Sequence, residues 1–290
     1  MPKIAYVNGQ YAPHRHAMVH IEDRGYQFAD GIYEVCLVIN GRYWDMEGHL
    51  ARMERSLGEL GIRSPMGPAP LKTVMNELLR RNRLRDALVY IQVTRGVAPR
   101  NHPFPIDDIE PALIMTARPF DLDQSDAQAV KGVAVITTPD IRWGRVDIKS
   151  ISLLPNVLAK QAAVEAGAVE AWLVRDGKVT EGSSSNAWIV TGDGVLVTHP
   201  KSNEILGGIT RETALACAAD LQMRVEERAF TVSEAKNAAE AFISSATNLV
   251  TPVVAIDGVK IGNGAPGAAA NRLRDAYKER ARRISGHENG

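Results

Sequence analysis

The segment Arg145-Val-Asp-Ile-Lys-Ser-Ile-Ser152 places one lysine, Lys149, just after an expected strand and just before an expected helix. A side chain at such a boundary has little conformational freedom, and buried lysines lose their charge and become nucleophiles. Most lysines are nevertheless solvated surface residues, because a charged amine is seldom buried. This position therefore indicates a catalytic lysine only if other segments supply groups that would work with it.

Three further segments supply such groups. The run Val179-Thr-Glu-Gly-Ser-Ser-Ser-Asn186 sets an acid, Glu181, before small hydroxyl residues. Ile205-Leu-Gly-Gly-Ile-Thr210 leads into an expected helix, whose first N–H groups form a phosphate site. Ser244-Ser-Ala-Thr247 ends an expected strand with more donors. A nucleophilic lysine, an acid and a phosphate cradle together predict a pyridoxal phosphate pocket, in which the lysine forms a Schiff base and the acid pairs with the pyridine nitrogen.

The composition limits the other classes of function. The 290-residue chain has 34 basic and 34 acidic side chains, a formal net charge of 0, and is 45% hydrophobic. This is typical of a globular protein, and the length favours two domains. The charge balance gives no general attraction to nucleic acid, and no apolar run approaches the roughly 18 residues of a membrane span. Cys36 and Cys217 lie far apart in apolar-patterned segments, which indicates buried thiols and a cytoplasmic protein.

Hydrophobic periodicity predicts an α+β fold with two domains. Runs rich in Val, Ile, Trp and Tyr predict strands at Ile32–Ile39, Ala87–Thr94, Ala112–Ala117, Gly132–Thr138, Ala171–Val174, Ala187–Val190 and Ala241–Ser244. Five Asn-Gly or Asp-Gly pairs, beginning at residues 8, 40, 176, 193 and 257, predict antiparallel hairpins. Helical periodicity is found over residues 50–60, 71–79, 156–166, 210–221 and 268–283. We expect domains at 1–118 and 130–290, joined by an Asp- and Gln-rich linker over 119–129.

Two other motifs are weighed and set aside. Gly262-Asn-Gly-Ala-Pro-Gly267 matches the dinucleotide-binding pattern, but too few residues follow it for the strand and the ribose-binding acid. His14 and His16 could share one face of a strand and bind a metal, but no third ligand lies near them in sequence. A solvated loop is the better interpretation of the two histidines, and we expect no metal site.

With these segments and two others, the sequence resembles the fold type IV pyridoxal phosphate enzymes, and among them the D-amino acid transaminases. The similarity extends from about Tyr6 to Gly258. It is carried by Asp23-Arg-Gly-Tyr-Gln-Phe-Ala-Asp-Gly-Ile-Tyr-Glu-Val35, by Thr94-Arg-Gly-Val-Ala-Pro-Arg-Asn-His102 and by the segments around Lys149, Glu181 and Gly208. It implies the two-domain α+β fold of that family, with mainly antiparallel sheets and flanking helices.

The resemblance also implies which residues bind the cofactor. Lys149 would hold it as a Schiff base and then act as general base and acid on the substrate. Glu181 would bind the pyridine nitrogen, and Leu206 would pack on the ring. The phosphate would be bound by Arg52, Ile209, Thr210, Ser245 and Ala246. Position 246 departs from the family, which often has a hydroxyl residue there, and the backbone N–H would serve instead.

The same resemblance implies a substrate class and a partner. Arg100-Asn-His102 is similar to the loop by which D-amino acid transaminases hold the substrate carboxylate, with Tyr33 assisting. The planar fork of arginine suits a carboxylate. In family members the neighbouring subunit contributes this loop, which implies a homodimer with active sites at the subunit interface. The expected reaction transfers the amino group of a D-amino acid, such as D-alanine, to a 2-oxo acid, such as 2-oxoglutarate.

Three alternatives share some of these residues. An aminodeoxychorismate lyase would also need Lys149 and Glu181, but it would not need the Arg100–His102 loop. An L-branched-chain aminotransferase is the nearest rival, and the same loop argues against it. A non-catalytic module that binds phosphate or amino acids would explain the phosphate cradle, but not a lysine placed together with an acid.

Overall fold

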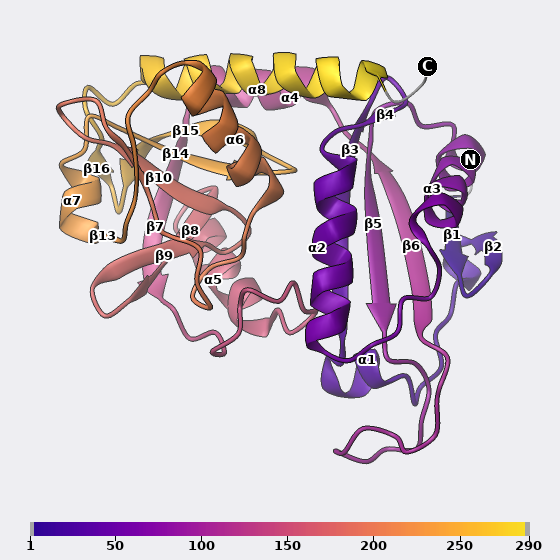
Figure 1. The fold of residues 1–290 in the computed structure, drawn as a ribbon. Helices are drawn as coiled ribbons and strands as arrows, with labels where there is room; N and C mark the ends of the chain where they lie inside the picture. Colours follow the sequence, from indigo (N-terminus) through magenta and orange to yellow (C-terminus); the bar gives the residue numbers. More distant parts are fainter. Residues whose placement is uncertain (1–2, 288–290) are drawn as a thin grey trace. The chain divides into compact units, whose positions relative to one another are not determined.

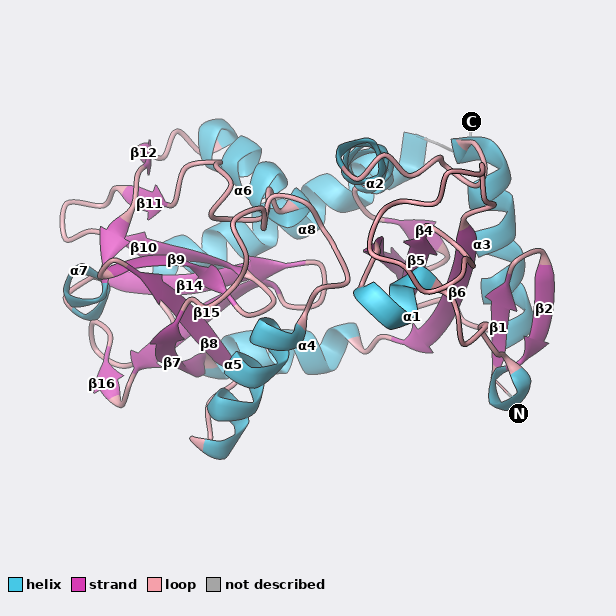
Figure 2. Cartoon of the chain, turned by 90° about the horizontal axis from the view of Figure 1, so that it is seen from below, coloured by secondary structure: helices cyan, strands magenta, loops and turns pink. Residues whose placement is uncertain are grey.

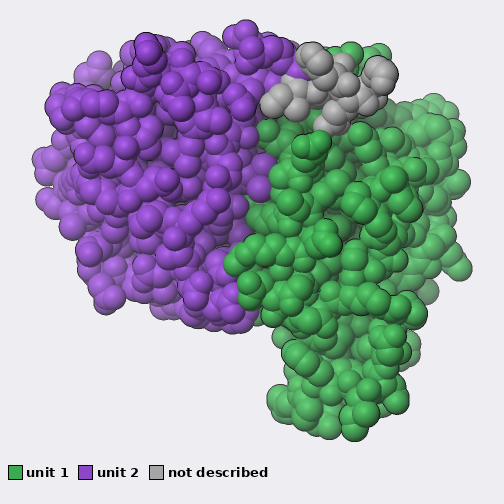
Figure 3. Space-filling model, viewed as in Figure 1, with its two compact units in different colours: residues 1–121, 148–152 green, residues 122–147, 153–290 purple. Residues whose placement is uncertain are grey.

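The chain forms two compact units (Figure 3). The computed structural model describes residues 3–287. Unit 1 comprises residues 1–121 and 148–152, and unit 2 comprises residues 122–147 and 153–290. The chain therefore leaves unit 2 for five residues around Lys149 and then returns to it.

This division differs in two places from the predicted domains 1–118 and 130–290. Most of the expected linker over 119–129 lies in helix α4 (Leu122–Lys131), whose Asp126 accepts a hydrogen bond from Arg274 at 2.8 Å within unit 2. Residues 148–152, expected in the C-terminal domain, belong to unit 1 because their backbone pairs with strand β3 (Gly31–Ile39). A surface helix is polar on most of its circumference, so an Asp- and Gln-rich composition does not distinguish it from a linker.

Unit 1 is a six-stranded antiparallel sheet with two long helices (Figure 1). Besides β3, its strands are β1 (Ile4–Val7), β2 (Gln10–Pro13), β4 (Arg42–Tyr43), β5 (Ala87–Thr94) and β6 (Ala112–Pro119). Its helices are the short η1 (His14–His16) and α1 (Arg24–Phe28) and the longer α2 (Met46–Glu59) and α3 (Pro68–Asn82). The strand order is β2-β1-β6-β5-β3-β4. Strands β3 and β5 thus lie side by side, and each has a neighbouring strand on both sides.

The core of unit 1 fixes which face each β3 side chain occupies. Ile32, Cys36 and Val38 alternate along β3 and pack in one cluster with Met53 and Leu57 of α2. Successive side chains of a strand point to opposite faces, so the residues between them lie on the other face of the sheet. Strand β3 therefore presents one row of side chains to α2 and the other row to the opposite side.

Unit 2 is built on a ten-stranded sheet. Its strands are β7 (Val133–Pro139), β8 (Glu170–Arg175), β9 (Lys178–Gly182), β10 (Asn186–Val190), β11 (Leu196–Thr198), β12 (Val225–Glu227), β13 (Phe230–Thr231), β14 (Glu240–Ser245), β15 (Leu249–Ile256) and β16 (Val259–Lys260). The order is β12-β11-β10-β14-β15-β7-β8-β9-β13, with β16 beside β15. Strand β7 is parallel to β15 and β8, and β11 is parallel to β12, whereas the other pairs are antiparallel. The predicted α+β fold with mainly antiparallel sheets is confirmed.

The helices of unit 2 lie against its strands (Figure 2). Besides α4 they are α5 (Leu154–Glu165), α6 (Ile209–Asp220), α7 (Val232–Lys236) and α8 (Ala268–His287). Ala159 and Ala163 of α5 pack against Ala171 and Leu173 of β8. Trp172, between these two β8 residues, faces the opposite side and joins a second apolar cluster. Both faces of β8 are therefore covered, which explains why its sequence is almost continuously apolar.

The predicted hairpin turns are also found. Four of the five dipeptides have a positive φ at both residues, as in Asn40-Gly41 (53° and 76°) and Asp176-Gly177 (51° and 75°). Both central residues of a type I′ turn need this conformation, and Asn, Asp and Gly adopt it at the lowest steric cost. The fifth pair, Asp193-Gly194, lies in a longer loop between β10 and β11, where only the glycine has a positive φ.

Other expectations concern single residues and the membrane. Cys36 and Cys217 are both buried, as predicted. His14 and His16 lie in the exposed η1, and the side chains described, those of residues 3–283, include no group arranged to hold a metal ion. In the same range, every helix is too short or too polar to span a bilayer.

Candidate active site

The backbone around Lys149 is fixed by β3 and α2. Tyr33 N donates to Lys149 O at 3.0 Å, and Ile151 N donates to Gly31 O at 3.1 Å. Ser150 N donates to Ile148 O at 2.7 Å, which closes a tight turn with Lys149 at its centre. These bonds hold the lysine backbone in one place, so the direction of its side chain is set by the sheet of unit 1.

The Lys149 side chain lies against an aromatic ring. Its Nζ is 4.1 Å from the centroid of Tyr33, which β3 presents on the face opposite α2. Tyr33 stacks on Tyr90 of β5, with ring centroids 5.7 Å apart, and the Tyr90 hydroxyl donates to Gln92. Burial, together with the neighbouring Tyr33, raises the pKa of Tyr90 to about 12. Tyr90 therefore remains neutral, and the two stacked rings form a fixed wall beside the amine.

A buried ion pair lies on the other face of β3. Arg52 Nε and Nη2, from α2, donate to the two carboxylate oxygens of Glu34 at 2.7 and 2.8 Å. His49 Nδ1 is 2.8 Å from the same carboxylate, whose side chain is 1% exposed. Burial alone would raise the pKa of Glu34, but Arg52 and His49 outweigh it and hold the pKa well below its usual range. Glu34 therefore stays ionised and fixes the plane of the Arg52 guanidinium.

Arg100 and His102 lie in an exposed loop of unit 1. Arg24, which is buried, donates through Nη1 to Asn101 O at 2.7 Å and through Nη2 to His102 O at 3.2 Å. The Phe28 ring lies 5.1 Å from Arg100 Cζ and 5.5 Å from the His102 ring. The predicted carboxylate loop is thus held at its base, while its two functional side chains stay accessible.

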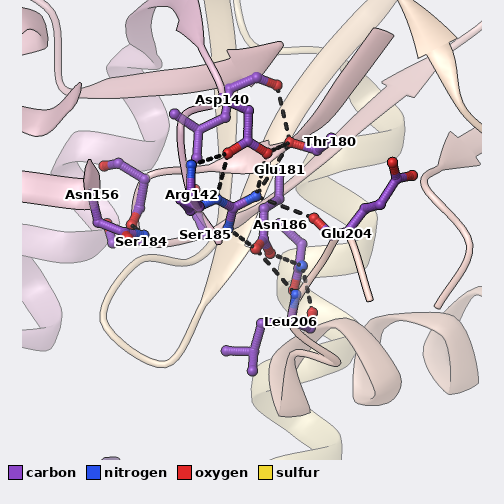
Figure 4. A network of polar contacts seen from close by, with 12 residues as sticks. Asp140, Arg142, Asn156, Thr180, Glu181, Ser184, Ser185, Asn186, Glu204 and Leu206 are labelled. Atoms are coloured by element: carbon purple, nitrogen blue, oxygen red, sulfur yellow. Dashed lines mark hydrogen bonds and ion pairs between the residues drawn. The ribbon is translucent and has the colours of Figure 1, made fainter. Parts of the chain in front are cut away.

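Unit 2 contributes Glu181, at the end of β9, inside a dense network of donors (Figure 4). Glu181 Oε1 accepts from Leu206 N at 3.1 Å and from Arg142, and Oε2 accepts from Asn186 Nδ2 at 2.9 Å. The Glu181 and Arg142 side chains are 6% and 5% exposed. Charged hydrogen bonds in such a dry environment stabilise a negative charge on the carboxylate.

Arg142 is in turn held by Asp140. Its Nη2 donates to Asp140 Oδ2 at 2.9 Å, and Thr180 Oγ1 donates to the same oxygen at 2.9 Å. Burial would raise the pKa of Asp140, but these partners lower it to about 2. Arg142 therefore stands between two carboxylates. Sequence reasoning missed this arginine, because it lies in an irregular loop with no motif around it.

The predicted phosphate-binding segments meet at one end of the unit 2 sheet. Asn186 of β10 lies opposite Ser244 of β14, and Ser245 is the last residue of that strand. A Cβ on Gly208, the N-terminal cap of α6, would collide with the Asn186 side-chain oxygen, so only glycine allows this approach. The N–H groups of Ile209 and the next residue have no acceptor within the helix. These N–H groups, beside Asn186, are free of helical acceptors and can bind an anion.

The turn that contains Ala246 offers a hydroxyl that we did not assign. Thr247 Oγ1 is 3.2 Å from Ser245 Oγ, which also accepts from Asn248 N at 3.1 Å. Ala246 has no hydroxyl, and Thr247 places one at the next residue. The predicted site residues thus fall into two sets: Lys149, Tyr33, Arg52, Arg100 and His102 belong to unit 1, and Glu181, Leu206, Ile209, Thr210, Ser245 and Ala246 belong to unit 2.

A lysine beside an aromatic wall, an ionised buried acid and an anion site at a helix N-terminus are the elements of a cofactor-dependent aminotransferase. The chain belongs to the family described as amino-transferase class IV, whose profile matches residues 31–256. The predicted family and enzyme class are therefore confirmed.

Individual relatives give a closer comparison. The D-alanine aminotransferase of Bacillus licheniformis is 44% identical over 271 residues, covering 93% of this chain and 94% of that protein. The D-alanine aminotransferase of Staphylococcus aureus (strain N315) is 42% identical over 279 residues, covering 96% and 98%.

Solved structures confirm the fold. The branched-chain amino acid aminotransferase of Escherichia coli matches with a TM-score of 0.87 at 21% identity, covering 97% of this chain and 95% of that one. The branched-chain aminotransferase of the thermophilic archaeon Thermoproteus uzoniensis, solved with norvaline, matches with a TM-score of 0.84 at 25% identity, covering 100% and 97%.

Proposed function

We propose that this chain is a pyridoxal phosphate-dependent D-amino acid transaminase that uses D-alanine as a donor and 2-oxoglutarate as an acceptor. The observation that carries the proposal is the Glu181 network, because a buried carboxylate held ionised is the partner that a protonated pyridine ring needs. The substrate class is supported by the relatives at 44% and 42% identity, both of which are D-alanine aminotransferases.

The donor chemistry of the chain fits this cofactor. Glu181 offers a carboxylate for the ring nitrogen. Leu206 lies beside this carboxylate in space, and its backbone N–H donates to Glu181 Oε1. The phosphate would be bound by Arg52, by the N–H groups of Ile209 and Thr210, by Ser245 at the end of β14 and by Ala246 in the turn that follows. When bound, pyridoxal phosphate withdraws electrons from the Cα of the amino acid. Glu181 keeps a proton on the ring nitrogen, which strengthens that withdrawal.

Lys149 has two functions in the proposed mechanism. Its amine would hold the cofactor, and the freed amine would accept the proton from the substrate Cα as a general base and donate it again as a general acid. The Tyr33 ring beside Nζ limits the directions from which the amine can reach that proton. Because one amine carries out both proton transfers, they take place on the same face of the substrate.

Arg100 and His102 are proposed to hold the substrate carboxylate, with Tyr33 assisting. Arg24 anchors the backbone of their loop and leaves both side chains exposed, which fits a loop that serves the active site of a second subunit. We therefore propose a homodimer with its active sites at the subunit interface. We also propose that the enzyme is cytoplasmic, which agrees with the burial of Cys36 and Cys217.

An absorbance experiment tests this function. The protein, loaded with pyridoxal phosphate, is mixed with D-alanine in one cuvette and with L-alanine in another. We expect a visible absorption band that converts with D-alanine and stays unchanged with L-alanine. Conversion with only the L-amino acid would overturn the assignment of Arg100 and His102, and a protein that binds no pyridoxal phosphate would overturn the function as a whole.

Replacing Glu181 with glutamine is expected to lower kcat with D-alanine by about 10²-fold, the loss seen when one preorganised electrostatic group is removed. A neutral amide keeps the shape of the side chain but no longer stabilises a proton on the pyridine nitrogen. Steady-state kinetics with D-alanine measure the loss. Glu204→Gln is the matched control, because its side chain is 44% exposed and only its backbone oxygen binds Arg142. An equal loss in both variants would contradict the prediction.

A further inference from the structure

Glu170, the first residue of β8, has a fully buried side chain that the proposed mechanism does not use. Its Oε1 accepts from Ala171 N at 2.9 Å and from the Ser183 hydroxyl. Its Oε2 accepts from Ser184 N at 3.2 Å, from Ser184 Oγ at 2.9 Å and from Ser185 Oγ at 2.9 Å. The three serine hydroxyls that follow Glu181 thus bind a buried acid of the same unit.

These serines form the turn that joins Glu181 to Asn186, and its geometry is tight. Gly182 N donates to Ser185 O at 2.6 Å. A Cβ on Gly182 would collide with Ser185 Oγ and lie 3.2 Å from Glu170 Cδ, so glycine is required for the turn to reach the carboxylate. Asn156 of α5 donates to Ser183 O at 2.8 Å, which ties the turn to that helix as well.

Both ends of this turn belong to the proposed cofactor site. Glu181 precedes it, and Asn186, which donates to Glu181 and lies against Gly208, follows it. A shift of the turn would therefore move the acid for the pyridine nitrogen and the residue beside the phosphate cradle together. The hydrogen bonds of Glu170 run to Ala171 and to the three serines of the turn, so we expect its effect on the reaction to act through the turn.

We propose that Glu170 is a positioning residue, which places Glu181 and Asn186 by binding the Ser183–Ser185 turn. The inference rests on the proposed function. A glutamine cannot replace Glu170, because one carboxylate oxygen would become an NH₂ group, which donates and does not accept. In one orientation of the amide, Ser184 N would lose its acceptor, and in the other, Ala171 N would lose its own. A hydroxyl can rotate and accept a hydrogen bond from the new NH₂ group, but a backbone N–H has a fixed direction and can only donate. The backbone of the turn must therefore move.

The first test needs no cofactor. Hydrogen–deuterium exchange of the peptide over residues 179–187 is compared in cofactor-free wild type and Glu170→Gln. We expect the amides of the turn to exchange about tenfold faster in the variant, because local opening is easier once buried hydrogen bonds are lost. Glu165→Gln, at an exposed position of α5, is the matched control and leaves this peptide unchanged. Equal exchange in wild type and Glu170→Gln overturns the inference.

The second test separates positioning from general stability. Glu170→Gln is expected to lower kcat with D-alanine by about 10- to 100-fold, because small displacements of catalytic groups have effects of this size. In the Glu181→Gln background the same change should have little further effect, since the group that it places is already altered. An equal fold-loss in both backgrounds would mean that Glu170 supports only the fold, and it overturns the inference.

Two additions make the result decisive. If Glu170→Gln does not fold, Ser184→Ala replaces it, because this exposed serine keeps its backbone bond to Glu170 and loses only the hydroxyl. The expected changes are then smaller and in the same direction, and their absence counts against the inference. Wild type is assayed first: a wild type without transaminase activity overturns the proposed function, while the exchange experiment still decides whether Glu170 holds the turn.

Discussion

Replacement of Lys149 by alanine is expected to lower kcat with D-alanine by about 10²- to 10⁴-fold, the contribution of a placed general acid–base group. The same variant loses the covalent bond to pyridoxal phosphate, so borohydride reduction no longer attaches the cofactor to the chain. The fold should survive, because Tyr33 N, Gly31 O and Ser56 Oγ bind the backbone around Lys149 and leave its side chain out of the core.

Peptide mapping after borohydride reduction measures the attachment directly. In wild type the cofactor mass should appear on the peptide that contains Lys149, and in Lys149→Ala it should appear on none. Lys178→Ala, an exposed lysine of β9, is the control and should keep both labelling and activity. Labelling of another lysine in wild type would contradict the assignment.

The chemistry of the site could be predicted where it depends on a few neighbouring residues. Glu181 precedes a run of serines, and Gly208 precedes a helix, so both patterns are visible in a short window of sequence. Arg142 and Glu170 could not be found in this way. Arg142 reaches Glu181 across 39 residues and Glu170 reaches Ser183 across 13, and neither pairing leaves a local pattern.

The same distinction applies to the fold. Turns such as Asn40-Gly41 are encoded by the residues that adopt a positive φ, so the hairpins follow directly from the sequence. The parallel pairing of β7 with β15 joins residues about 120 positions apart, and the pairing of Ser150 with Ile32 carries the Lys149 segment into unit 1. Such contacts depend on which apolar faces fit together, and hydrophobic periodicity does not specify that.

The second large effect concerns the stability of the folded chain, to which the buried ion pair of Glu34 and Arg52 contributes. Glu34→Gln is expected to lower the free energy of unfolding at pH 7 by about 3–5 kcal/mol, because it leaves the Arg52 guanidinium buried without its carboxylate. The pKa of Glu34 is lower in the folded chain than in the unfolded chain, where it is about 4.3. Glu34 therefore contributes its full stabilisation above that pH and loses it as the pH falls toward the folded-state pKa.

Urea unfolding of wild type and Glu34→Gln at pH 7 and at pH 3 tests this prediction. The difference in free energy of unfolding between the two proteins should be smaller at pH 3. At that pH the Glu34 carboxylate stabilises wild type less than at pH 7, whereas the glutamine does not titrate. Glu77→Gln is the control: Arg80 and Arg81 also lower the pKa of Glu77, to about 2, but all three side chains lie at the surface of α3, where solvent screens the pair. Two results would mean that Arg52 does not depend on Glu34. One is a loss of unfolding free energy in Glu34→Gln as small as that in the control, and the other is a loss that is equal at both pH values. In that case the guanidinium proposed to bind the phosphate would be held by other contacts of α2.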